Sequence, residues 1–212
     1  MDGVLVDSES VNFEALRRLL AGRGVRYTED DDRRFRGRRN VDLFADLRSR
    51  HAGLPPDPEL DQELTAIHTA LIRERCTPMP GVPDVPAAIA ARGYPLALAS
   101  SAVPPVIALT LRTVGLDELF AVRVSGSDVP RGKPAPDIFL EAARRLGQPP
   151  ARCLVVEDSR NGLLAAVAAG MPCAAVPCQL TRDEGFAEAS VRLTSLAGLL
   201  PLLPPLRGSQ PA

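Results

Sequence analysis

Polar side chains able to hold phosphate and a metal ion follow several short apolar runs of this 212-residue sequence. The runs "LALAS" (96–100), "FAVRVSG" (120–126) and "RCLVVED" (152–158) each lead into hydroxyl or carboxyl groups, and the chain opens with "MDGVLV". Adjacent carboxylates suit Mg²⁺, and a hydroxyl together with an ammonium group can bind phosphoryl oxygens. The residues concerned are Asp2, Ser100, Ser101, Ser125, Asp128, Lys133, Glu157 and Asp158.

Lys133 is a compositional exception in this chain. It is the only lysine among 25 basic residues, and the others are all arginines. An ammonium group is a compact point charge, whereas a guanidinium is a planar fork, so the two are not interchangeable at a tight site. We therefore expect that the chemistry at position 133 requires the compact cation.

Each of these residues also has a plain structural explanation. In "EDS" (157–159), Asp158 or Ser159 could cap the helix that follows, and a hydroxyl at 100 could do the same for the next helix. Lys133 in "RGKPAPD" could be an ordinary loop lysine flanked by prolines. The joint placement of all these groups at strand ends favours a functional site over each separate explanation.

The pattern of apolar residues predicts how these groups are positioned. From residue 81 onward, short apolar runs alternate with helical segments near 104–115, 136–146 and 160–169, which predicts a doubly wound, parallel α/β sheet with a Rossmann-like core. In such sheets the ligand site lies at the carboxyl ends of the strands. Residues 8–80 have the pattern of amphipathic helices joined by polar loops, so residues 1–7 and 81–212 form the expected core.

Four segments resemble, in order and spacing, the motifs of the haloacid dehalogenase superfamily. They are "DGVLVDSE", "LALASS", "GKPAPDIFLEAARRLG" and "VVEDSRNGLLAAVAAGMPC". The resemblance is to the phosphatase and β-phosphoglucomutase-like branch, which carries a helical cap after its first motif. It spans nearly the whole chain and implies a Mg²⁺-dependent phosphomonoester hydrolase with residues 8–80 as the cap.

The resemblance also implies roles for individual residues. Asp2 is the acid and base of the first motif and also a metal contact, Ser100 binds the phosphoryl group, and Lys133 neutralises it. Glu157 and Asp158 are the acidic metal ligands. The first motif of the family has a nucleophilic aspartate two positions before the acid, which would fall just before Met1 and is absent from this sequence.

Two explanations of the absent nucleophile stay open at this point. One is that the sequence starts within the motif, so that a strand ending in aspartate precedes Met1; we expect this one. The other is a non-catalytic relative that keeps the metal and phosphate pocket as a binding protein. On the first explanation, the chain as given is expected to be inactive.

The branch of the family and the substrate are less directly indicated. Asp2 argues against a dehalogenase, and a cap without lysine argues against the phosphonoacetaldehyde hydrolases. A mutase is the alternative to a phosphatase, but Asn12 stands where the resemblance places a mutase histidine. The loop "RRFRGRRN" (33–40) suggests Arg36 and Arg39, together with Ser101 and Asn12, as substrate-binding residues, although "EDDD" (29–32) could make it a solvated face.

Composition argues against several other classes of protein. A net charge of −1 and 4% aromatic residues give no basis for nucleic-acid binding. The sequence has no apolar run of membrane-spanning length, and its four cysteines show no metal-binding spacing. We expect a cytoplasmic monomer with reduced thiols that acts on a small phosphorylated metabolite, which the sequence does not identify.

Overall fold

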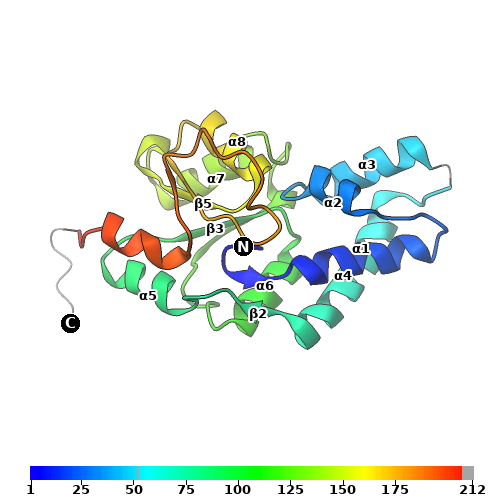
Figure 1. Ribbon diagram of the computed structural model, residues 1–212, viewed down its shortest axis with the longest axis horizontal. Helices are drawn as coiled ribbons and strands as arrows, with labels where there is room; N and C mark the ends of the chain where they lie inside the picture. Colours follow the sequence, from blue (N-terminus) through cyan, green and yellow to red (C-terminus); the bar gives the residue numbers. More distant parts are fainter. Residues whose placement is uncertain (52, 207–212) are drawn as a thin grey trace.

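The computed structural model describes residues 1–51 and 53–206. It has two parts, which lie side by side in Figure 1. A helical unit, α1 to α4, is built from residues 9–75. The remaining helices surround short parallel strands, as in the α/β fold predicted from the sequence.

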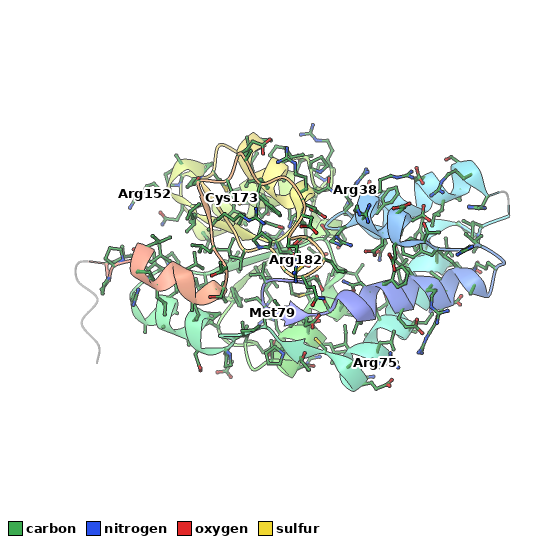
Figure 2. The ribbon with its side chains drawn as sticks, viewed as in Figure 1. Arg38, Arg75, Met79, Arg152, Cys173 and Arg182 are labelled. Carbon is green, nitrogen blue, oxygen red and sulfur yellow. The ribbon has the colours of Figure 1, made fainter. Side chains whose placement is uncertain are left out.

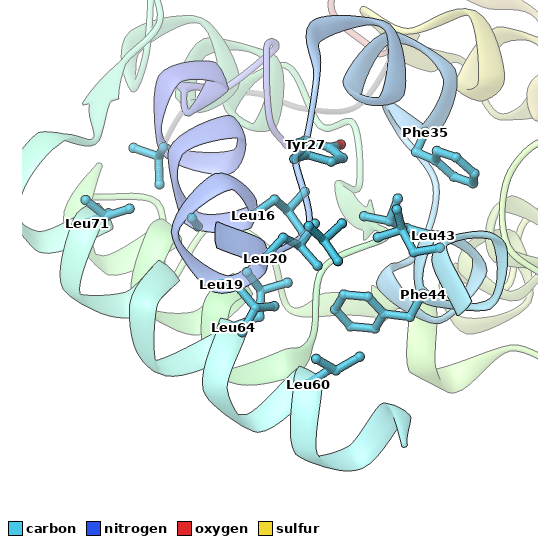
Figure 3. Close-up of a cluster of buried hydrophobic side chains, with 14 of the residues drawn as sticks. Leu16, Leu19, Leu20, Tyr27, Phe35, Leu43, Phe44, Leu60, Leu64 and Leu71 are labelled. Atoms are coloured by element: carbon cyan, nitrogen blue, oxygen red, sulfur yellow. The ribbon is translucent and has the colours of Figure 1, made fainter. Parts of the chain in front are cut away.

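The helical unit is held together by its own apolar core. Helix α1 packs along α4, and α3 packs against α4, around buried leucine and phenylalanine side chains (Figure 3). Leu19, Leu60, Leu64 and Phe44 are at most 1% exposed. The bounds are α1 Glu9–Ala21, α2 Glu29–Phe35, α3 Asn40–Arg50 and α4 Asp57–Arg75.

Helix α2 begins with a reciprocal cap that the sequence supplies locally. The Thr28 hydroxyl accepts a hydrogen bond from the amide of Asp31, and the Asp31 carboxylate accepts one from the amide of Thr28. This arrangement satisfies amides that the first helical turn leaves without partners. It fixes the start of α2 and therefore the direction of the loop that follows at 36–39.

The parallel strands of the α/β part form two separate sheets. Strand β3 pairs in parallel with β4, with Ser100 opposite Ser125, and β5 pairs in parallel with β6, which pairs with β7. Among the described residues no strand joins β3 to β5. The bounds are β3 Ala97–Ser100, β4 Val122–Ser125, β5 Val155–Glu157, β6 Cys173–Ala175 and β7 Val191–Arg192.

Helices cover these strands from two sides (Figure 1). One buried cluster joins the strands to α5, α6 and the 3₁₀ helix η3, and another joins them to α7 and α8. Helices on both faces explain why the strands are almost continuously apolar. The bounds are α5 Asp84–Ala91, α6 Pro104–Thr113, α7 Asp137–Leu146, α8 Arg160–Ala168, η1 Gly126–Asp128, η2 Pro150–Arg152 and η3 Leu196–Leu202.

The first residues of the chain form a turn. The amides of Leu5 and Val6 donate to the carbonyl of Met1, and β1, Val6–Asp7, then pairs antiparallel with β2, Thr77–Pro78. This turn buries Leu5 and Val6 and brings Asp2 to the edge of the parallel strands. No helix in the described part of the chain is long and apolar enough to cross a membrane.

Candidate active site

All nine residues predicted for the site line one cavity of about 150 Å³ between the helical unit and the parallel strands. Loops at the carboxyl ends of β3 and β5 form its floor, and α1, α4 and the loop after α2 form its roof. The predicted residues in its wall are Asp2, Asn12, Arg36, Arg39, Ser100, Ser101, Lys133, Glu157 and Asp158.

Lys133 and Glu157 form a buried ion pair in this cavity. The Lys133 ammonium donates to Glu157 Oε1, and the two side chains are 5% and 8% exposed. The ammonium also lies 4.8 Å from the centre of the Phe139 ring. Burial alone would raise the pKa of Glu157, but Lys133 outweighs this effect and holds that pKa below its ordinary value.

Asp158 and Asp2 bring further negative charge to the same place. Burial raises the pKa of Asp158 to about 7, and the charges of Glu157 and Asp2 contribute to the increase. Gly3, with φ +65°, lies so close to Asp158 that a β-carbon there would overlap the carboxylate. Asp2 itself accepts a short hydrogen bond from the Ser8 hydroxyl.

The carboxylates are not arranged as a complete metal site. Among the described residues, no group of three or more histidine, cysteine, aspartate or glutamate side chains could hold a metal ion. The reason is local, because Glu157 is bound by Lys133 and also accepts from the Ser159 hydroxyl at 2.9 Å. Asp2 and Asp158 are left as the two carboxylates that a cation would neutralise.

Three serine hydroxyls at the ends of β3 and β4 have different partners. The Ser100 oxygen accepts a hydrogen bond from the amide of Ala102 at 3.2 Å and lines the cavity. Ser101 donates to the carbonyl of Gly37 at 2.7 Å, and Ser125 donates to the carbonyl of Ala102 at 2.7 Å. Ser100 is therefore the hydroxyl placed for a ligand, whereas Ser101 connects β3 to the loop after α2.

Arg36 and Arg39 reach the cavity wall, but their guanidinium groups bind protein atoms. Arg36 pairs with Asp32 at 2.8 Å and with Glu184 at 3.1 Å. Arg39 pairs with Asp42 at 3.1 Å and donates to the carbonyls of Val129 and Pro130 at 3.1 and 3.2 Å. The sequence suggests substrate contacts for both arginines, whereas the structure uses them to hold the loop against the α/β part.

Two polar residues of the cavity wall, Arg38 and His68, were not among the site residues predicted from the sequence. Arg38 and His68 both line the cavity, and Arg38 Nε and His68 Nε2 are buried without a hydrogen-bond partner in the described structure. His68 had a detectable signal, because it continues the buried helical stripe of Leu60 and Leu64 at a spacing of four. Nothing in the sequence separates Arg38 from the arginines beside it.

The fold and the cavity together define an α/β protein with a candidate ligand site at the carboxyl ends of parallel strands. A family model described as haloacid dehalogenase-like hydrolase matches residues 1–170. The chain belongs to that family, in agreement with the resemblance found from the motifs.

Several proteins similar to this chain are named as phosphatases, and one similar structure contains bound phosphate. Protein CbbY of Rhodobacter capsulatus is 32% identical over 208 residues, covering 93% of this chain and 91% of that protein. Hexitol phosphatase B of Escherichia coli K12 is 30% identical, covering 94% and 91%. The crystal structure of CbbY from Rhodobacter sphaeroides in complex with phosphate matches with a TM-score of 0.86 and 30% identity, covering 96% of each chain.

Proposed function

We propose that this protein is a Mg²⁺-dependent phosphomonoester hydrolase that acts on a small phosphorylated metabolite. The observation that carries the proposal is the convergence of Asp2, Ser100, Lys133, Glu157 and Asp158 on one cavity at the strand ends. A buried ammonium group and a serine hydroxyl can hold phosphoryl oxygens there. The phosphatases among the relatives give independent support for the same class of reaction.

The residues divide into three roles under this proposal. Lys133 and Ser100 bind the phosphoryl oxygens, and Lys133 also keeps Glu157 ionised at neutral pH. Asp2 protonates the leaving group and later accepts a proton from the attacking water. Residues 8–80 act as a cap over the α/β core, because the loop at 36–39 closes the cavity from the helical side.

Asp2 and Asp158 fit a Mg²⁺ ion by the chemistry of their oxygens. Mg²⁺ is held by one or two carboxylates with water and phosphate oxygens as its other ligands, so two acids suffice. Burial, together with the charges of Glu157 and Asp2, raises the pKa of Asp158, so a bound cation would favour the charged form of this carboxylate. When bound, the ion neutralises phosphoryl oxygens. Glu157 is the third predicted ligand and is held here by Lys133.

A gap between the two parallel sheets supports a further strand that supplies the nucleophile. A second cavity, of about 580 Å³, lies between β3 and β5 and is lined by residues of both strands together with Met1, Val4 and Leu5. Each of these strands is hydrogen-bonded on one edge to a neighbour of its own sheet. We propose that an apolar strand ending in aspartate fills this gap, directly before Met1, and that the 212-residue chain alone is inactive.

Extending the chain tests the proposal directly. A chain with about six added apolar residues ending in aspartate should release inorganic phosphate from a panel of phosphorylated metabolites when Mg²⁺ is present. Replacing the added aspartate by asparagine, or making Asp2→Asn in the extended chain, should abolish release. Turnover by the 212-residue chain itself, free of host phosphatases, would contradict the assignment of the nucleophile.

Hydrolysis is favoured over a mutase reaction by Asn12. Its side chain lines the cavity at the position where the resemblance places a mutase histidine. An amide neither gains nor loses a proton near neutral pH, so it cannot move protons between substrate hydroxyls. An extended chain that interconverts glucose 1-phosphate and glucose 6-phosphate faster than it hydrolyses either would favour the mutase.

A monomeric state and a cytoplasmic location stay predictions. The four cysteines are free, and two of them, Cys173 and Cys178, are buried. Free thiols are consistent with a reducing compartment. Sedimentation at micromolar concentration and fractionation of the source cells would test the two expectations.

A further inference from the structure

Among the described arginine and lysine side chains in the cavity wall, Arg38 differs from the others because it has no carboxylate partner. Asp32 and Glu184 are bound by Arg36, Asp42 is bound by Arg39, and Glu157 is bound by Lys133. The guanidinium of Arg38 makes no hydrogen bond or ion pair in the part of the chain that the structure describes. The roof of the cavity therefore carries one uncompensated positive charge.

Arg38 is held in place by an aromatic ring. Its guanidinium carbon lies 5.1 Å from the centre of the Phe35 ring, and Phe35 is 7% exposed. Figure 2 shows Arg38 beside α2, at the end of the helical unit nearest the α/β part. A stacked guanidinium loses little conformational entropy when it binds a ligand, and its planar fork matches a carboxylate or a phosphate.

His68 is a second polar group with no partner on the same roof. It is 9% exposed, and its Nε2 atom is buried without a hydrogen bond in the described structure. A buried nitrogen without a partner among the protein atoms is unfavourable unless a bound molecule satisfies it. Two such atoms in the wall of one cavity indicate a place for a polar ligand.

We propose that the cavity takes a phosphorylated metabolite with a second anionic group, which Arg38 binds, and that His68 contacts an oxygen of the carbon skeleton between the two. The inference rests on the proposed function, since the first phosphate occupies the site of Ser100 and Lys133. Arg38 then determines the preference for substrates with a second anionic group. Arg36 and Arg39 only position the loop that carries Arg38. The second anion can be a phosphate or a carboxylate, because both fit the guanidinium fork.

Binding of three probes to the 212-residue chain tests the inference without turnover. Calorimetry would compare fructose 1,6-bisphosphate and 6-phosphogluconate, which carry a second phosphate or a carboxylate, with fructose 6-phosphate, which has no second anion. We expect at least one doubly anionic probe to bind about tenfold or more tightly than fructose 6-phosphate. The tighter of the two identifies the preferred anion.

Three variants distinguish the effect of Arg38 on binding from the effect of the general positive charge of residues 33–39. Arg38→Gln should bring the preference for the doubly anionic probe to about one and leave the affinity for fructose 6-phosphate nearly unchanged. Arg33→Gln removes the same charge from exposed α2 and should keep the full preference. Arg38→Lys, which retains charge without the fork, should keep only part of it.

The outcomes that would contradict the inference can be distinguished from one another. Equal wild-type affinity for all three probes, or a full preference in a folded Arg38→Gln protein, overturns the role of Arg38 while the phosphate site stands. Binding of none of the probes overturns the proposed function together with this inference. His68→Ala should weaken all three probes by about three- to tenfold, and unchanged affinities would overturn its role.

Discussion

The one lysine of the chain occupies a place that suits an ammonium group. Lys133 is buried between the carboxylate of Glu157 and the ring of Phe139. A buried ion pair contributes little net stability, because desolvation of both charges offsets their attraction. Under the proposed function, the pair keeps a concentrated positive charge in place for phosphoryl oxygens.

Lys133→Met should therefore destabilise the protein severely. The substitution leaves the Glu157 carboxylate buried without its counterion, a loss of about 3–5 kcal/mol of unfolding free energy, measurable by urea denaturation. Arg131→Met is the matched control, since it breaks an ion pair with Asp137 in which the arginine is 70% exposed. The control should lose much less unfolding free energy. Equal losses for the two variants would contradict the argument that burial of the Glu157 carboxylate causes the destabilisation.

His68 makes stability depend on pH in the acidic range. Burial lowers its pKa from 6.5, whereas the charge of Asp2 acts in the opposite direction. The unfolded chain thus binds more protons than the folded one below pH 6.5, so stability falls as the pH drops through that range, by at most about 1.4 kcal/mol per pH unit. The loss of stability continues until the pH reaches the pKa of His68 in the folded protein.

His68→Gln should flatten this part of the stability curve, whatever it does to stability at neutral pH. Urea denaturation at several pH values between 5 and 7 would measure the slope. His51→Gln is the control, because His51 is only partly buried at the end of α3. If wild type and His68→Gln have the same slope, burial of the imidazole does not control the acid response.

At the scale of elements, the first turn of α8 lies directly against the end of β5. Ser159 caps this helix by accepting from the amide of Gly162 at 3.1 Å, and Gly162 is packed against the Glu157 carboxylate. A β-carbon at 162 would overlap that carboxylate. The glycine is thus needed for close approach and not for an unusual backbone angle.

Gly162→Ala should destabilise the protein even though alanine is the better helix former. Alanine usually gains about 1 kcal/mol in a helix, but overpacking at a buried contact costs about 1–3 kcal/mol and displaces Glu157 from Lys133. Gly22→Ala is the control, because a β-carbon there meets nothing closer than 3.8 Å. The midpoints of thermal unfolding of both variants would test this expectation. A Gly162→Ala protein more stable than wild type would contradict the packing argument.

At the scale of the whole molecule, the loop at 36–39 makes several polar contacts with the α/β part. Besides the contacts of Arg36 and Arg39, the side-chain amide of Asn161 donates to the carbonyl of Arg36 at 2.8 Å, and the Ser101 hydroxyl donates to that of Gly37. Gly37 has φ +77°, and a β-carbon there would lie 2.6 Å from Ser159 Oγ. These contacts hold the cavity in the closed arrangement seen here.

Removing both positioning arginines should loosen this arrangement. In the double variant Arg36→Gln with Arg39→Gln, we expect amide hydrogens of residues 36–40 to exchange about tenfold faster, because local opening no longer breaks the ion pairs. The double variant Arg33→Gln with Arg34→Gln loses equal charge from exposed positions and serves as control. Unchanged exchange at 36–40 would show that backbone contacts alone hold the loop.

Much of the architecture could be predicted from the sequence. The alternation of apolar runs and helical segments predicts α6, α7 and α8 and strands β3 to β6 closely, because both periodicities are local properties. Among the described residues β3 and β5 do not pair, because a cavity lies between them, and the strand expected to join them stays a prediction. Strand order is a long-range property that local pattern does not encode.

The sequence by itself determined which chemical groups this protein can bring to a site, because strand ends, motif spacing and the single Lys133 can be recognised locally. Only the tertiary structure decided what each group is free to do. Three of the five arginines in "RRFRGRRN" lie beside Gly37 and look alike, yet Arg36 and Arg39 meet carboxylates of α2, α3 or the distant Glu184, and Arg38 meets none among the described residues. Charge pairing depends on distances of a few ångströms between segments far apart in the chain, and folding alone sets those distances.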